Sequence, residues 1–237
     1  MTHPPYPGPP SAPDAFPSPQ HPGSPPTTQT SRAFNPASGL AYAAMAVAGL
    51  FVVYDIVEAG FAFAAEDEYL EASRQGLTAV DVFTTYDFIA IPWILVAIAT
   101  YVVSCLWLYQ VRANAELLDH GAHHTRSRGW VWGSWIVPVV NLWFPFQVVR
   151  DVSKPPISPT PGVLLGWWWA FWLAYIITSQ IGARLTGFGE IDPGAIRALG
   201  TIESISAGIG VVAVVLWLAL IRRIRQGQAA SAAALEG

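Results

Sequence analysis

The chain has 237 residues, of which 53% are hydrophobic and 12% charged, and its formal net charge is −4. Soluble domains carry about 25% charged residues, so this shortfall indicates that lipid surrounds much of the chain. Eleven tryptophans agree with this, because tryptophan concentrates where a helix crosses the lipid–water boundary. The small net charge and the lack of a basic, aromatic-interleaved stretch in the sequence argue against nucleic acid as a partner.

Residues 1–36 form the first predicted segment, and 11 of the 20 prolines lie within its first 35 positions. Proline removes backbone donors and favours extended chain, so we expect a disordered tail. Its PxxP spacings allow either a ligand for a proline-recognition domain or a plain spacer. The apolar core of a signal peptide is missing from the tail.

Four segments are long and apolar enough for spans, since about 20 helical residues cross the hydrocarbon of a bilayer. They are residues 39–63, 88–109, 162–183 and 202–221. We therefore predict an all-α, polytopic membrane protein with a four-helix domain over residues 37–226 and a short cytoplasmic tail over 227–237. The lone cysteine, Cys105, lies in an apolar run and is expected to be a small buried side chain.

Residues 130–149 are a fifth apolar candidate, but Pro138 and Pro145 interrupt them. Each proline would free a carbonyl, and lipid-exposed backbone cannot leave such groups unpaired. We therefore expect an interfacial or re-entrant segment rich in tryptophan and proline, and not a fifth span.

The distribution of Lys and Arg separates the two topologies, because these residues favour cytoplasmic loops. With four spans and a cytoplasmic N-terminus, nine lie inside and three outside. With a fifth span the count becomes six to six. The sequence therefore predicts a multi-pass protein of the cell membrane, with both termini in the cytoplasm.

Two blocks carry a resemblance, LWLYQVRANAELL at residues 106–118 and RGWVWGSWIVPVVNLWFPFQVVRDV at 128–152. They resemble the bacterial membrane family called "domain of unknown function 4328", and the resemblance covers roughly residues 40–225. It implies a multi-span membrane protein without an assigned activity. The positions that match the family motif are Trp107, Arg112, Asn114, Trp135, Pro138, Asn141, Pro145, Arg150 and Asp151. We expect Arg150 and Asp151 to pair locally or with Arg112, Asn114 and lipid headgroups.

Asp55 and Glu58 are the candidate intramembrane acids, and their spacing puts both on one face of a helix. An acid at membrane depth costs about 2.5–3.5 kcal/mol and usually faces a cavity or a partner. One interpretation is a proton- or cation-handling site, joined by Glu203 from the last span. The other places Glu58 at the outer interface, with Arg184 or Arg197 as its partner.

His120, His123 and His124, with Asp119, form a cluster between the second and third spans. Gly121 argues against a helix there. We expect a solvated loop, with weak zinc or nickel binding as the alternative. The sequence predicts no metal site and no cofactor.

The predicted function is that of a non-catalytic scaffold or accessory membrane component. The sequence lacks the motifs of common hydrolases and nucleotide-binding enzymes, so no enzymatic activity is expected. The expected partners are the lipid bilayer and proteins that meet residues 1–36 or the tryptophan-rich face. The alternative is a small transporter or channel that uses Asp55, Glu58 and the broken segment 130–149.

Overall fold

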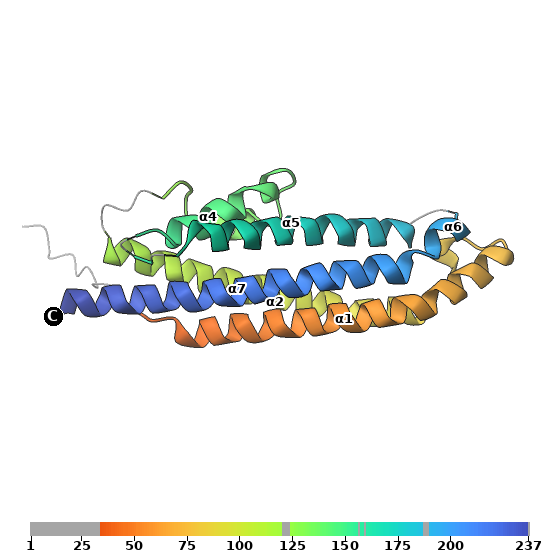
Figure 1. Ribbon diagram of the computed structural model, residues 1–237, viewed down its shortest axis with the longest axis horizontal. Coiled ribbons are helices and arrows are strands. Elements are labelled where there is room, and N and C mark those ends of the chain that lie inside the picture. The colour runs from red at the N-terminus through yellow and green to blue at the C-terminus, as the bar shows by residue number, and fades with distance from the viewer. Residues whose placement is uncertain (1–33, 120–123, 156, 159, 187–189, 237) are drawn as a thin grey trace, which may run out of the picture. The chain divides into compact units, whose positions relative to one another are not determined.

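A computed structural model describes residues 34–119, 124–155, 157–158, 160–186 and 190–236 of the chain. These residues are helical apart from turns and one isolated bridge, and four helices are long: α1 (Ser38–Arg74), α2 (Thr85–Leu118), α5 (Gly162–Leu185) and α7 (Leu199–Glu236) (Figure 1). Each is long and apolar enough to cross a membrane, which confirms the predicted all-α, four-span class. The predicted tail, residues 1–36, falls outside the described residues except for its last three positions.

The long helices extend beyond the predicted spans. α1 continues to Arg74, and α7 continues through residues 227–236, which we had predicted as a separate tail. Both extensions are rich in alanine, glutamine or glutamate, which are good helix formers in water. Helix length therefore exceeds membrane thickness at both ends of the bundle.

A glycine turn and a helix cap shape the connection between α1 and α2. α2 begins with a capping box in which the backbone N–H of Thr84 donates to Asp87 Oδ2 at 2.8 Å, and Asp87 N–H donates back to Thr84 Oγ1 at 3.3 Å. α1 ends before Gly76, whose φ of 74° reverses the chain. The short helix η1 (Ala79–Asp81) lies between these two points.

The four long helices pack side by side in the order α2, α1, α7, α5. Consecutive neighbours run antiparallel, and α1 begins at the end of the bundle where α7 finishes (Figure 1). α2 and α5, the outer members of this order, scarcely contact each other. The space between them is therefore available to another part of the chain.

Residues 130–152 lie beside this space and fold into α3 (Trp130–Gly133), η2 (Val140–Leu142) and α4 (Phe144–Val152). α3 and α4 pack on α2, and α4 also packs on α5. Within the described residues the segment contributes no fifth long helix, as its prolines predict. Its tip exposes apolar side chains: Ile136, Val137 and Val139. Such a tip suits the predicted interfacial or re-entrant placement.

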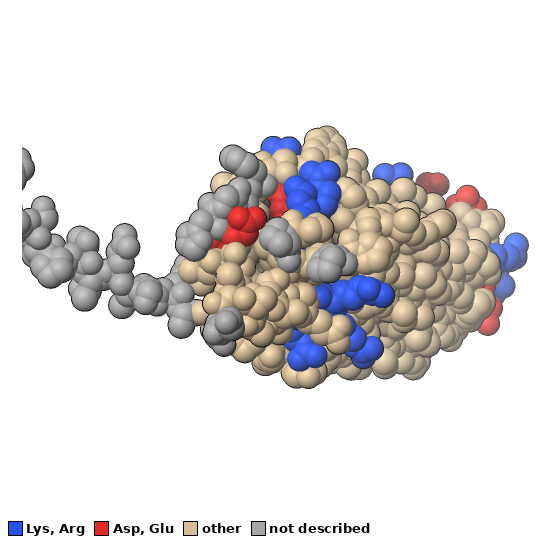
Figure 2. Space-filling model, turned by 60° about the vertical axis from the view of Figure 1, so that its left-hand side comes forward, with Lys and Arg blue, Asp and Glu red and all other residues tan. Residues whose placement is uncertain are grey.

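The charged side chains gather toward the two ends of the bundle, with a broad band of other residues between them (Figure 2). Eight of the eleven described Lys and Arg residues lie on the ends or loops near the start of α1. Arg74, Arg184 and Arg197 lie at the other end. The basic residues are thus concentrated at one end of the bundle, which is the distribution that the four-span topology predicts.

Gly227 of α7 packs closely on the loop before α5, and the first prediction concerns this contact. A Cβ added there would lie 2.8 Å from Ser158 Cα, whereas one added at Gly208 of the same helix would meet nothing within 4 Å. Overpacking costs about 1–3 kcal/mol, and glycine-to-alanine changes in helices otherwise gain up to about 1 kcal/mol. We expect Gly227→Ala to lower, and Gly208→Ala to maintain or raise, the unfolding midpoint in detergent. Equal midpoints would contradict the close packing.

Candidate functional site

Asp55 of α1 lies in the interior of the bundle, with 7% of its surface exposed. Two aromatic side chains from other helices donate hydrogen bonds to its Oδ1 atom. Trp93 Nε1 of α2 donates at 2.6 Å, and the Tyr175 hydroxyl of α5 donates at 3.2 Å. The second carboxylate oxygen, Oδ2, is buried without a hydrogen-bond partner. The carboxylate is therefore held in place through one oxygen, and the other faces Gly210 of α7.

Glu58 and Glu203 lie near Asp55, as the cation-site interpretation expects. Glu58 is one helical turn further along α1, close enough to Glu203 and Asp55 for electrostatic repulsion between the carboxylates. Glu203 of α7 accepts a hydrogen bond from the Tyr86 hydroxyl at 3.2 Å. The fold thus brings three carboxylates from two helices into one region of the bundle.

The expected basic partner of these acids is missing from the ion pairs of the described residues. Those pairs join Arg74 to Glu71, Arg112 and Arg128 to Glu116, and Lys154 to Asp151. In the described part of the chain, neither Arg184 nor Arg197 pairs with Glu58. The same residues contain no group of three or more His, Cys, Asp or Glu side chains arranged to hold a metal ion.

A cavity of about 320 Å³ occupies the space between α2 and α5. Trp93 and Tyr175, the two residues that hold Asp55, contribute to its wall. Trp135 and Asn141 of the irregular segment (residues 130–152) also line it, so motif residues and the two residues that hold Asp55 meet at one cavity. Sequence reasoning missed Trp93 and Tyr175. The available signal was a hydrogen-bond donor inside a span, where tryptophan is less common than at the boundary.

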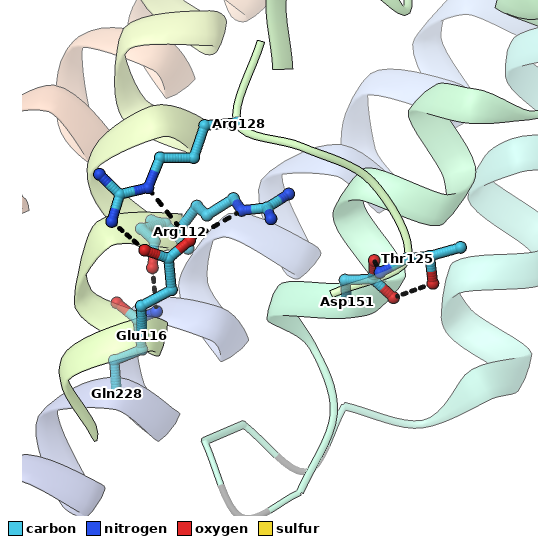
Figure 3. A network of polar contacts seen from close by, with 7 residues as sticks. Arg112, Glu116, Thr125, Arg128, Asp151 and Gln228 are labelled. Carbon is cyan, nitrogen blue, oxygen red and sulfur yellow. Dashed lines mark hydrogen bonds and ion pairs between the residues drawn. The ribbon is translucent and has the colours of Figure 1, made fainter. Parts of the chain in front are cut away.

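The motif residue Arg112 of α2 belongs to an ion-paired network near the end of the bundle (Figure 3). Arg112 Nε donates to Glu116 Oε1 at 3.2 Å, and Arg128 from the following loop contacts both oxygens of the same carboxylate. The Arg112 side chain is 5% exposed and its Nη1 is buried without a partner. Glu116, which sequence reasoning did not single out, therefore joins the loop to the helix.

Asn114 and Trp107 fix α7 against α2. Asn114 Nδ2 donates to Gln228 Oε1 at 3.2 Å, and Gln228 Nε2 donates to the Val111 carbonyl at 2.8 Å. The Trp107 ring is fully buried and meets Trp217 edge-on, with the ring centroids 5.6 Å apart. Both motif positions therefore serve helix packing.

Asp151 pairs locally, with Lys154, and accepts hydrogen bonds from the chain before α3; in the described part of the chain it forms no pair with Arg150, Arg112 or Asn114. Its two oxygens accept hydrogen bonds from the Thr125 backbone at 2.6 Å and hydroxyl at 3.0 Å (Figure 3). Lys154 Nζ donates a third hydrogen bond, to Asp151 Oδ1 at 2.9 Å. Arg150 lies over the Phe146 ring instead, 5.9 Å from its centroid. Lys154 follows the end of α4, three residues after Asp151, and this spacing places it, not Arg150, beside the carboxylate.

The remaining motif residues shape the irregular segment. Pro145 is buried in the first turn of α4, where its missing N–H costs little, whereas Pro138 lies at the exposed tip. Trp135 packs edge-on against Trp172, with the centroids 6.0 Å apart, and Asn141 faces the cavity.

Cys105 of α2 is buried, as predicted, and its Sγ donates to the Val131 carbonyl at 3.3 Å.

His124 is half-buried with both imidazole nitrogens unpartnered, so it is not the solvated residue we predicted. His120 and His123 lie outside the described residues. Burial, together with the nearby Arg112, lowers the pKa of His124 below its usual value. The unfolded chain then binds more protons than the folded one, so acid destabilises the fold.

This gives the second prediction, a loss of stability that sets in as the pH falls through about 6.5, the pKa of unfolded histidine, and continues down to the lower pKa of folded His124. The unfolding midpoint in detergent should fall with pH over this window. His124→Gln should flatten the profile without removing the contribution of other groups. Identical profiles for the variant and the parent would show that His124 contributes nothing.

Four long apolar helices, a polar network at one end and an internal cavity define a multi-span membrane protein. A family model described as "Domain of unknown function (DUF4328)" matches residues 72–226, more than half of the chain, so the chain belongs to that family. The match includes every motif position but begins later than the expected residue 40, which leaves Asp55 and Glu58 before it. No curated protein and no solved structure matches the chain.

Proposed function

We propose that this protein is a non-enzymatic membrane component that binds a cation inside its helix bundle and passes it across the membrane. One observation carries the proposal: a buried carboxylate, Asp55, accepts hydrogen bonds from two residues of the cavity wall, Trp93 and Tyr175, and forms no ion pair in the described part of the chain. A charge placed at membrane depth is costly and usually belongs to a substrate or ion pathway. A cation in the cavity would offset that cost.

The scaffold role is less well supported by the geometry. Trp168 and Trp169 are buried and pack on neighbouring rings, so much of the tryptophan-rich face is engaged within the bundle. Residues 1–33, the other expected binding surface, lie outside the described residues. Binding of proteins by that segment therefore stays a prediction.

Charge movement in proteoliposomes tests the proposal. The purified protein would be adsorbed on a solid-supported membrane and exposed in turn to gradients of H⁺, Na⁺, K⁺ and tetramethylammonium. We expect a transient current with at least one of these cations, and a loss of about tenfold or more in Asp55→Asn. Asp67→Asn is the matched control, because Asp67 is an exposed acid on the same helix. Absence of any wild-type current would refute transport.

We also propose that both termini face the cytoplasm, because eight of the eleven described Lys and Arg residues lie at that end of the bundle. The third prediction concerns single cysteines at the exposed positions Gln226 and Gln75, at opposite ends, in a Cys105→Ser background. In intact cells, an impermeant thiol reagent should label Gln75→Cys and leave Gln226→Cys unlabelled until the membrane is opened. The reverse pattern would invert the orientation.

A further inference from the structure

The wall of the internal cavity is dominated by aromatic rings. Eight lining side chains are aromatic, among them Trp93, Trp135, Trp168, Trp172, Tyr175 and Trp217. Its volume of about 320 Å³ falls at the lower end of the range for cavities that hold small organic molecules. Aromatic faces attract cations through the negative potential above each ring, most strongly where water is excluded. The wall thus suits an apolar molecule that carries positive charge.

The wall also carries polar side chains, among them Ser104 and Asn141, and two of its buried polar atoms have no partner. Ser104 lines it with 9% of its surface exposed and a buried hydroxyl without a hydrogen-bond partner. Trp135 Nε1 is likewise buried and unpartnered. Asp55 is not part of the wall, but two wall residues, Trp93 and Tyr175, donate hydrogen bonds to it, and its unpartnered Oδ2 faces Gly210 of α7. Buried polar atoms normally find partners, so these orphans point to a ligand.

An inorganic ion fits this arrangement poorly. Sodium, calcium and magnesium need several oxygen ligands at short range, and calcium and magnesium take about six or more. No group of three or more acidic, histidine or cysteine side chains is arranged to hold a metal ion within the described ranges. Aromatic rings cannot replace those oxygens. An organic ammonium ion, in contrast, needs only a nearby negative charge and an aromatic enclosure.

We propose that this cavity binds an organic ammonium ion with an apolar or aromatic substituent. The ammonium group lies against the rings nearest Asp55, and the substituent packs against the remaining aromatic wall. The inference deepens the proposed function, on which it rests, by naming the class of substrate. It also explains why Asp55 has no basic partner in the described part of the chain: the ligand supplies the positive charge.

Binding of a charged probe and its neutral isostere tests the inference on the full-length protein in nanodiscs. The probes are benzyltrimethylammonium and neopentylbenzene, which share a shape and differ by one charge. Quenching of tryptophan fluorescence, corrected with empty nanodiscs, reports occupancy. We expect the charged probe to bind wild type about tenfold or more tightly than the neutral one, the ratio that about 1.4 kcal/mol produces.

The Asp55→Asn variant should lose this preference while it still binds the neutral probe, which also shows that the cavity is intact. Asp67→Asn should bind both probes as wild type does. An equal affinity of wild type for the two probes would overturn the inference, whether or not Asp55→Asn folds. A preference that survives in Asp55→Asn would overturn it as well.

The binding measurement tests the class of ligand, and the current measurement tests transport, so each can fail without the other. Currents carried by Na⁺ or H⁺ without binding of benzyltrimethylammonium would overturn the substrate class and leave cation transport standing. Charge-dependent binding without any current would refute transport and retain the ammonium site.

Discussion

Replacing Glu116 by glutamine is expected to destabilise the protein by about 2–4 kcal/mol, somewhat less than the cost of breaking a fully buried ion pair. The carboxylate of Glu116 pairs with both Arg112 and Arg128, and its side chain is 28% exposed. Arg112 is almost fully buried, so glutamine would leave its guanidinium charge uncompensated in a region with little water. An SDS titration of the folded protein in micelles measures the loss.

Glu71→Gln is the matched control for this fourth prediction. Glu71 pairs with Arg74 on α1, but the two side chains are 57% and 71% exposed. Exposed pairs contribute about 0–1 kcal/mol, so the control should change stability little. Comparable losses in the two variants would show that burial of Arg112 does not make its pairing important.

Truncation of Trp168 to alanine is the fifth prediction, with an expected loss of about 3–5 kcal/mol. Trp168 is 2% exposed and stacks on Trp217, with ring centroids 5.1 Å apart. It also meets Trp135 edge-on at 6.4 Å, which ties the irregular segment to α5. Removing the ring would leave a void where three parts of the chain meet, and the surrounding helices could close it only in part.

Trp167→Ala tests whether position rather than residue type decides the outcome. Trp167 precedes Trp168 on α5 but is 59% exposed, toward the surface that lipid covers. Its removal should cost far less, because no packed cluster loses a member. Should the two variants unfold at the same SDS fraction, the aromatic cluster would not be a principal source of stability.

Sequence reasoning established the class of protein and the number of spans. The length of the apolar runs and the low charge predict four helices, because the hydrocarbon layer fixes how many apolar residues a span needs. Pro138 and Pro145 likewise predict that residues 130–149 are not a span, since freed carbonyls cannot remain unpaired in lipid. These features depend on local composition and chain geometry, which the sequence displays directly.

The spacing of Asp55 and Glu58 predicts a shared helical face, and the structure places them near Glu203. Periodicity within one helix cannot say which donors on other helices meet that face. Trp93 and Tyr175 lie on α2 and α5, and only the packing of these helices around α1 and α7 brings them to Asp55.

The sequence by itself determined the apolar helices, the irregular tryptophan- and proline-rich segment and the family, because each is written in consecutive residues. Only the tertiary structure decided that α2 and α5 stand apart, and that the irregular segment lines an aromatic cavity between them beside a buried carboxylate. A cavity is bounded by side chains from many helices, and their mutual positions follow from the packing of the whole bundle.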